Sequence, residues 1–450
     1  MKHVPGGIDR PDGEKTIMDN IEARTIRKVS SRLVPYLVLC YFIAYLDRVN
    51  VGFAALTMNK ALGLTATMFG FGAGIFFLTY FIFEVPSNLA LERFGASRWI
   101  ARIMVSWGVV SAAQAFVTGA TSLNIVRLIL GIAEAGFFPG IIFYLTLWFP
   151  ASYRARIIGS FMFAIPLSTA IGSPISGFIL HLEGVWGLHG WQWLFLLEGL
   201  PSLILGVITW FYLTDRPAKA DWLADDERLW LQNRLAAEQT TRESKVRLAW
   251  RQTLFNPRVI GLAFVYMSIT VSLYGLSFFL PQIVKAFGTG DIASGFIVAF
   301  PYAIGAVCML LWGRFSDRIK ERKWTTIFPL VMIAVGLVTA AYTDSLTGKI
   351  LAVSIGAFGV FSAFAVFWTL PTAFLSGTAA AAGIAWINSV GNLGGYFGPK
   401  VFGYLKDTTH TDFYGMVFFA AFAIVGAALV LVMGHDIRLE QPAGSIVEAE

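Results

Sequence analysis

Four charged residues interrupt two strongly apolar segments of the chain. Asp47 and Arg48 lie within VPYLVLCYFIAYLDRVNVGFAAL, and Arg127 and Glu134 lie within SLNIVRLILGIAEAGFFPGIIFYL. A charge in the hydrocarbon of a bilayer costs at least about 2.5 kcal/mol on insertion scales. We therefore predict that these residues line a polar route through a membrane and are the main functional candidates.

These residue types suit the transport of an anion, which needs a cation to hold it and a titratable group to couple it to protons. Asp47 and Arg48 are adjacent and would point about 100° apart on a helix, so one can face a cavity and the other a neighbouring helix. Arg127 and Glu134 are seven residues apart and would share one helix face. A guanidinium that approaches or leaves a buried carboxyl would switch it between ionised and protonated forms. The alternative is that static pairs only fix helix packing.

The composition indicates an integral membrane protein. Of the 450 residues, 56% are hydrophobic and 14% are charged, and the mean hydropathy is +0.66. Roughly a quarter of the residues of a soluble domain are charged. The apolar runs approach the ~20 residues that a helix needs to cross hydrocarbon. We predict an all-α membrane protein with twelve transmembrane helices, at residues 33–56, 68–91, 99–119, 123–148, 155–181, 191–214, 258–285, 292–314, 324–343, 347–374, 379–405 and 413–434.

The basic residues predict the orientation of these helices, because Lys and Arg near span ends stay cytoplasmic. With both termini inside, 27 of the 34 Lys and Arg residues fall on the cytoplasmic side and 4 on the other side. Residues 1–32 then form a cytoplasmic segment rather than a cleaved signal peptide, and residues 435–450 form a cytoplasmic tail. Anionic inner-leaflet lipids account for the net charge of +6, so we expect no nucleic-acid partner. Cys40 and Cys308 lie in spans and predict no disulfide framework.

A long polar segment divides the chain into two six-helix halves. Residues 215–257 contain DWLADDERLWLQNRLAAEQ, whose apolar residues predict an amphipathic helix on the cytoplasmic membrane surface. The halves are then 33–214 and 258–434. SNLALERFGASR, after the second span, is similar to WGRFSDRIKERK, after the eighth. Such internal repeats are typical of alternating-access carriers.

The second of these loops resembles the G-x-x-x-D-R signature of the major facilitator superfamily. Gly313 to Arg318 reads GRFSDR, and Glu92 with Arg93 forms a weaker copy in the first loop. The resemblance implies the major facilitator fold, and the acid and base of each loop, Glu92, Arg93, Asp317 and Arg318, are expected to latch the cytoplasmic helix ends. The alternative is a solvated charge run that enforces topology.

Several motifs in order are similar to the anion:cation symporter branch of that superfamily, namely YLDRVNVGFAAL, FEVPSNLALERFGASRW, VRLILGIAEAGFFPGIIFYLTLWFP, RARIIGSF and GWQWLFLLEGLPSLILG. Its bacterial members carry tartrate, galactonate, 4-hydroxyphenylacetate or phthalate, and SLYGLSFFLPQIVKAFG resembles the tartrate-type members most. The resemblance implies that Asp47 and Glu134 are proton-coupling sites and that Arg48 binds the substrate carboxylate. It implies that Arg127 is a second anion contact or a partner for an acid.

Neutral side chains of a cavity would orient a small ligand. Resemblance to the galactonate-type carriers places Tyr80, Trp368 and Asn388 at substrate-binding positions, and Tyr274 and Asn392 could also line the path. Ile165 stands where those carriers present Gln, which favours a shorter or more apolar carboxylate. The embedded charges Glu84, Glu198 and Lys400 have more ordinary structural interpretations.

The leading hypothesis is a proton-coupled importer of a small organic anion in the inner membrane. An anion exchanger is the alternative within transport, and a membrane sensor or membrane-embedded enzyme is the alternative outside it. The sequence contains no G-x-x-x-x-G-K-[ST] phosphate loop, H-E-x-x-H metal motif or nucleophile elbow. We therefore expect no ATP coupling, no enzyme activity, no cofactor and no metal. A monomer is expected.

Overall fold

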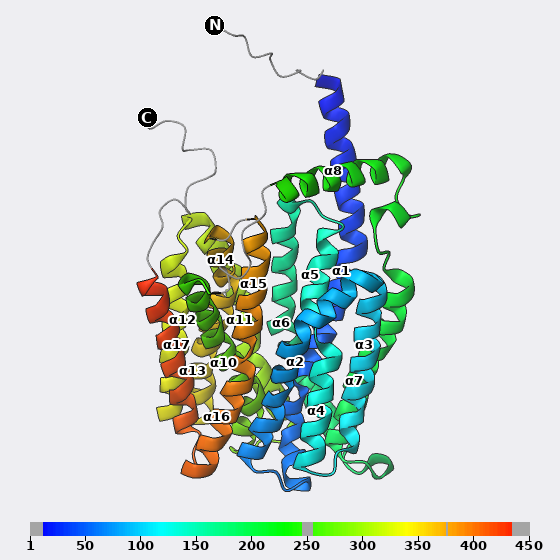
Figure 1. Ribbon diagram of the computed structural model, residues 1–450. Helices are drawn as coiled ribbons and strands as arrows, with labels where there is room; N and C mark the ends of the chain where they lie inside the picture. The colour runs from blue at the N-terminus through cyan, green and yellow to red at the C-terminus, as the bar shows by residue number, and fades with distance from the viewer. Residues whose placement is uncertain (1–11, 245–254, 375–376, 434–450) are drawn as a thin grey trace.

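Long helices that run side by side form two groups in the computed structural model, which describes residues 12–244, 255–374 and 377–433 (Figure 1). Every regular element in these ranges is helical. The first group comprises α1 (Asp12–Ala61), α2 (Ala66–Phe94), α3 (Ala96–Ala113), α4 (Ala120–Glu134), α5 (Phe137–Thr146), α6 (Ala151–Leu180) and α7 (Gly190–Tyr212). The second comprises α10 (Pro257–Lys285), α11 (Asp291–Ile319), α12 (Lys323–Tyr342), α13 (Leu346–Phe367), α14 (Thr369–Phe374), α15 (Gly377–Asn392), α16 (Gly394–Thr409) and α17 (Phe413–Val432). Between them lies α8 (Asp225–Ser244).

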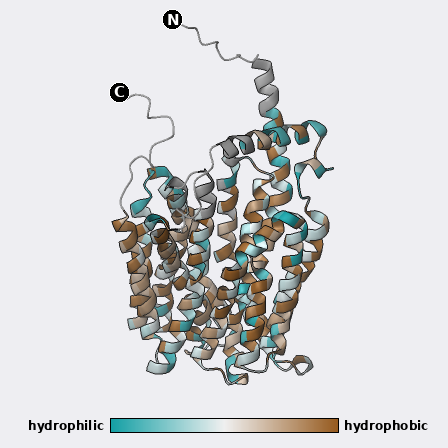
Figure 2. Ribbon diagram, viewed as in Figure 1, coloured by the Kyte–Doolittle hydropathy of each residue, from teal (hydrophilic) through white to brown (hydrophobic). Residues whose placement is uncertain are grey.

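Within the described residues, eleven helical segments are long and apolar enough to cross a membrane. The fourth of these segments joins α4 and α5, which meet at a break next to Gly136. The span expected at 379–405 consists of two helices, α15 and α16, which meet at Leu393. Hydrophobic residues predominate along the long helices, and hydrophilic residues gather at their ends (Figure 2). This is the pattern of a helical bundle that a bilayer surrounds.

The first helix is longer than its apolar run. The sequence predicts a span at 33–56 after a polar segment, whereas α1 is helical from Asp12 and continues past the bundle (Figure 1). The start of α1 and the end of α17 lie at the same end of the bundle. We call this the inner end, which the distribution of basic residues assigns to the cytoplasm, and we call the opposite end the outer end.

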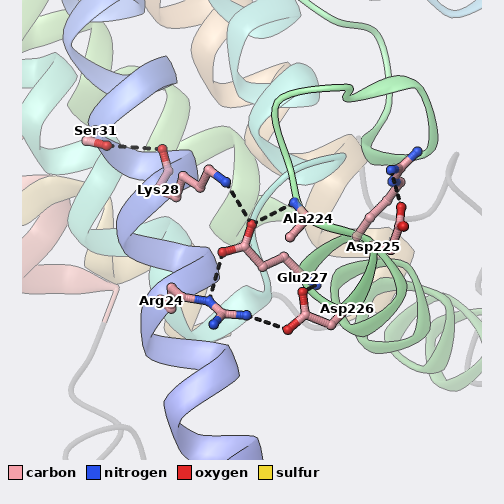
Figure 3. Close-up of polar contacts among 8 residues, drawn as sticks. Arg24, Lys28, Ser31, Ala224, Asp225, Asp226 and Glu227 are labelled. Atoms are coloured by element: carbon pink, nitrogen blue, oxygen red, sulfur yellow. Dashed lines mark hydrogen bonds and ion pairs between the residues drawn. The ribbon is translucent and has the colours of Figure 1, made fainter.

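The inner extension of α1 is held by α8, which lies across the inner end of the first group (Figure 1). Glu227 of α8 is buried between Arg24 and Lys28 of α1, at 2.9 Å from Arg24 Nε and 3.0 Å from Lys28 Nζ (Figure 3). The same carboxylate accepts a hydrogen bond of 2.9 Å from the backbone N–H of Ala224. Arg24 also pairs with Asp226. These contacts fasten α8 to the first group of helices.

Replacing Glu227 with Gln should loosen α8. Burial raises the pKa of Glu227, but the Ala224 N–H and the Lys28 and Arg24 cations outweigh it, so the net pKa lies below its usual range. The ion pairs therefore stabilise docking above the ordinary carboxyl pKa and are lost as pH falls through the lowered value. At neutral pH, hydrogen exchange of the α8 amides should be several-fold faster in Glu227→Gln. Asp225→Asn, whose partner Arg228 lies on α8 itself, should leave exchange unchanged.

Two seams of direct backbone contact join the two groups near the outer end. Along the first seam, between α2 and α16, a Cβ on Gly70 would lie 2.2 Å from Pro399 O, and a Cβ on Gly403 would lie 2.2 Å from Ala66 O. Along the second, between α6 and α11, a Cβ on Gly295 would lie 2.5 Å from Ser173 O. Only glycine allows helices to approach so closely. The structure is therefore closed at its outer end.

A carboxylate reinforces the first seam. Asp407 of α16 accepts hydrogen bonds from the backbone N–H groups of Ala66, at 3.0 Å, and Thr67, at 2.7 Å. These N–H groups belong to the first turn of α2, which lacks partners within its own helix and carries the positive end of the helix dipole. The second group of helices thus caps a helix of the first.

Removing this cap should favour opening at the outer end. A helix cap contributes about 1 kcal/mol, so Asp407→Ala should raise the ratio of outer-open to outer-closed molecules about fivefold. Spin labels on Ala61→Cys and Thr411→Cys, in a background without Cys40 and Cys308, would report this ratio as a distance distribution. Ser345→Ala removes a cap at the outer end within one group, in which the Gly348 N–H donates to Ser345 Oγ, and should not change the ratio. An unchanged distribution in Asp407→Ala would contradict the prediction.

Candidate functional site

Arg48 lies at the centre of a buried polar cluster between the two groups of helices. Its residue is 7% exposed, and its Nη2 pairs with Oε1 of Glu134. Its Nη1 donates to the hydroxyl of Tyr274 on α10 at 3.3 Å. The guanidinium carbon lies 5.3 Å from the ring centre of Tyr80 and 5.8 Å from that of Tyr45. One cation therefore contacts α1, α2, α4 and, across the interface, α10.

The break between α4 and α5 gives Glu134 its position. Glu134 is the last residue of α4, and Gly136 has a φ of +85°, a conformation that favours glycine. A Cβ at Gly136 would also lie 2.4 Å from Ser87 Oγ on α2. Because the helix ends there, the Glu134 side chain reaches Arg48 from the end of one helix rather than from the flank of a continuous one.

Asp47 points away from this cluster, as an immediate neighbour of Arg48 on a helix must. It accepts hydrogen bonds from Trp107 Nε1, from Ser111 Oγ at 2.5 Å, and from Asn50 Nδ2 at 3.0 Å. Trp107 and Ser111 both belong to α3. Three donors therefore surround a carboxyl group that is 1% exposed and has no ion pair within the described residues.

Arg127 is completely buried but faces backbone rather than an acid. Its Nη2 donates to Ala73 O at 2.8 Å and its Nε to Gly72 O at 3.4 Å, both on α2. Its Nη1 has no partner among the described residues. The guanidiniums of Arg127 and Arg48 both lie against the ring of Phe76, at 5.0 and 5.5 Å from its centre. Arg127 thus sits behind the Arg48 cluster, and its Nη1 nitrogen is unpartnered among the described residues.

A third buried carboxyl group, close by, joins the two groups of helices. Glu84 of α2, 2% exposed, accepts hydrogen bonds from Asn388 Nδ2 at 3.0 Å and from Ser389 Oγ at 2.7 Å, both on α15. From the sequence alone, Glu84 has an ordinary structural interpretation. Its spacing of four residues from Tyr80 is the local signal that relates it to the cluster, because such residues share a helix face. The partners on α15 could not be deduced from any local pattern.

Trp368 and Asn392 are the remaining predicted substrate-binding residues. Trp368 packs against Tyr266, with ring centres 4.9 Å apart. Asn392 is half-buried at the end of α15 and makes no side-chain hydrogen bond among the described residues. The structure thus brings together Arg48, Glu134, Tyr80 and Tyr274, and it places Asn388 on Glu84.

The expected latch residues are exposed at the inner end. Asp317 pairs with Arg322 at 2.8 Å and so connects the end of α11 to the start of α12. Arg93 lies against the ring of its neighbour Phe94. Within the described parts of the chain, Glu92, Arg93 and Arg318 form no ion pair. Their role as a latch remains a prediction.

No group of three or more His, Cys, Asp or Glu residues in the described ranges could hold a metal ion. The cluster is instead one of guanidinium, carboxyl, hydroxyl and aromatic groups. Such groups can bind an organic anion and exchange protons.

Residues 37–399 match the Major Facilitator Superfamily. The chain belongs to this superfamily of membrane transporters. It is 50% identical over 427 residues to an Agrobacterium vitis protein named "Putative tartrate transporter", and the match covers 95% of this chain and 94% of that protein. It is 40% identical to a quinolone resistance transporter of Acinetobacter baumannii, over 92% of this chain and 96% of that one. It is 37% identical to the inner membrane transport protein RhmT of Escherichia coli, over 91% and 95%.

The fold agrees with this assignment. A crystal structure of a bacterial homologue of the human lysosomal transporter Spinster superposes with a TM-score of 0.74, covering 90% of this chain and 96% of that one at 17% identity. The transporter is therefore an all-helical, multi-pass membrane protein of the major facilitator fold and not an enzyme. The inner-membrane location that the sequence predicts is shared by the relative from Escherichia coli.

Breaking the buried Arg48–Glu134 pair should destabilise the transporter strongly. Removing one partner of a buried pair leaves an uncompensated charge, at a cost of about 3–5 kcal/mol. Glu134→Gln should therefore lower the unfolding midpoint in detergent far more than Asp317→Asn, which removes one member of an exposed pair worth at most about 1 kcal/mol. The double variant Arg48→Gln/Glu134→Gln should recover much of the loss. No recovery would mean that the two side chains do not interact.

Proposed function

We propose that this transporter imports a small organic anion together with protons, and that the anion is a carboxylate such as tartrate or a related hydroxy or aromatic acid. The observation that carries the proposal is the Arg48–Glu134 pair, which is buried and contacts Tyr274 of the opposite group of helices. The names of the relatives at 50% identity support the substrate class.

The pair supplies a physical link between anion and proton. A substrate carboxylate binds the Arg48 guanidinium at the expense of Glu134, because both are anions and compete for the same donors. Glu134 would then be an ionised carboxyl without a cation in a dry interior, which costs several kcal/mol. Taking up a proton removes that cost. Anion binding and proton binding therefore favour each other.

The contact with Tyr274 connects this exchange to movement of the two groups of helices. Arg48 now donates to the Tyr274 hydroxyl across the interface. A bound carboxylate accepts N–H groups of Arg48 and competes with Tyr274 for them. Its binding therefore changes the attraction between α1 and α10. Asp47 lies on the other side of α1, among donors from α3, and serves as the second proton-binding residue.

Uptake by reconstituted vesicles tests the proposal. An inward proton gradient should drive accumulation of radiolabelled tartrate, or of another acid from a panel of carboxylates, without substrate inside. Asp47→Asn and Glu134→Gln should lose accumulation and keep substrate exchange, because they no longer bind the coupled proton. Arg48→Ala should lose both, since the anion has no cation to bind. Arg102→Ala, which removes an arginine that lies against Trp99 on α3, is the matched control and should transport normally.

Two outcomes would replace the proposal. Uptake that needs a carboxylate on the far side and ignores the proton gradient would make the transporter an anion exchanger. Ligand binding without any flux would favour a membrane sensor. Normal binding of the anion by Arg48→Ala would remove the site assignment itself.

A further inference from the structure

Asn388 and Ser389 form a carboxylate-binding pair on α15. Asn388 Nδ2 donates to Oε1 of Glu84 at 3.0 Å, and Ser389 Oγ donates to Oε2 at 2.7 Å. The two donors thus hold both oxygens of one carboxyl group. The three residues are buried, with exposed fractions of 7% for Asn388, 6% for Ser389 and 2% for Glu84. The proposed mechanism does not use Glu84 or Ser389.

This arrangement repeats the one at Arg48. There, too, hydrogen-bond donors hold a carboxyl group of the protein itself, which is that of Glu134. Donors that hold one carboxylate can also hold the carboxylate of a ligand, because the ionised group only accepts hydrogen bonds and has the same shape in both. The interface between the two groups of helices therefore contains two sets of carboxylate-binding donors, and a glutamate occupies each of them.

The helix α2 places the Asn388–Ser389 pair on the inner side of Arg48. The Tyr80 ring centre lies 5.3 Å from the Arg48 guanidinium carbon. Glu84 follows Tyr80 by four residues, so it lies on the same face of α2 and one turn nearer the inner end. The two sets of donors are therefore neighbours along one helix face.

The helix α10, which belongs to the opposite group, gives the same order. Tyr274 contacts Arg48, and Thr270 lies on the same face of α10, one turn nearer the inner end. Thr270 Oγ1 donates to Gly391 O at 2.5 Å, and Gly391 is two residues from Ser389 on α15. The donors on α15 thus lie inward of Arg48 by one to two helical turns, or about 5–11 Å.

We propose that the Asn388–Ser389 pair binds the second carboxylate of a dicarboxylate substrate whose first carboxylate binds Arg48. Glu84 occupies the pair until the substrate displaces it, as Glu134 occupies Arg48. The separation of the two sets of donors suits a short dicarboxylate. The bound molecule joins the two groups of helices, because Arg48 belongs to the first group and the pair to the second. This inference rests on the proposed function, since it names the substrate class of the same site.

Glu84 is then an internal competitor of the substrate. It gives up both donors when the dicarboxylate binds, and a buried carboxylate without donors is costly. Part of the binding free energy of the substrate offsets that cost. An amide at position 84 has the shape of the carboxyl group without its charge, so its displacement costs less. Removing a competitor strengthens binding, whereas removing an acid with a structural role does not.

Binding of tartrate and threonate to the purified full-length transporter, measured by isothermal titration calorimetry, tests the inference. Threonate has a hydroxymethyl group in place of one carboxylate of tartrate. Glu84→Gln should lower the Kd of tartrate about tenfold and leave the Kd of threonate within about twofold. Ser389→Ala added to Glu84→Gln should remove the gain for tartrate, because it deletes one of the two donors. Glu198→Gln is the matched control, since Glu198 is a buried acid held by Ser176 within the first group of helices, and it should change neither Kd.

The outcomes separate this inference from the proposed function. An unchanged or raised Kd of tartrate in Glu84→Gln would overturn the inference, because Glu84 would then be a structural acid. An equal gain for threonate would also overturn it, since the effect would then come from a nearby negative charge and not from a shared carboxylate position. Binding of monocarboxylates by a wild type that binds no dicarboxylate would do the same. A wild type that binds no carboxylate at all would instead refute the proposed function.

Discussion

A buried guanidinium cannot be left without partners, and this constraint organises the centre of the transporter. Arg48 finds Glu134 on α4, Tyr274 on α10 and aromatic rings from α1 and α2. The helix α4 ends at Glu134, and Gly136 turns the chain just after it. This break allows the Glu134 carboxyl to reach the Arg48 guanidinium. A ligand that binds Arg48 displaces the Glu134 carboxylate, which is then a buried charge without a partner.

The interface between the two groups of helices combines two kinds of contact. Near the outer end, glycines let backbones touch along α2 and α16 and along α6 and α11, and Asp407 caps the start of α2. Farther in, the contacts are polar, through Arg48 with Tyr274 and Glu84 with Asn388 and Ser389. The glycine contacts separate without leaving a buried charge unpaired, whereas the Asp407 cap and the polar contacts farther in depend on the protonation state of a carboxyl group or on the partners of a guanidinium.

The helix α8 is attached to the first group of helices by ion pairs. Because Glu227 is held by Arg24 and Lys28, α8 is attached to the long inner extension of α1. Movement of the first group of helices would therefore carry α8 with it. The attachment is electrostatic and lies at the inner end of the bundle, where ionic strength and pH can act on it.

The membrane class, the positions of most helices and the superfamily can be predicted from the amino-acid sequence, because hydrophobic run length and motif order are local properties. It also singled out Asp47, Arg48, Arg127 and Glu134, since a charge in an apolar run is visible without any structure. The partners of these residues follow from the packing of the helices. This packing paired Arg48 with Glu134, turned Arg127 toward the α2 backbone, and buried Glu84 beside α15 and Glu198 beside Ser176 of α6. Local patterns cannot specify such contacts, because they depend on how separate helices pack and on which polar atoms remain unsatisfied after packing.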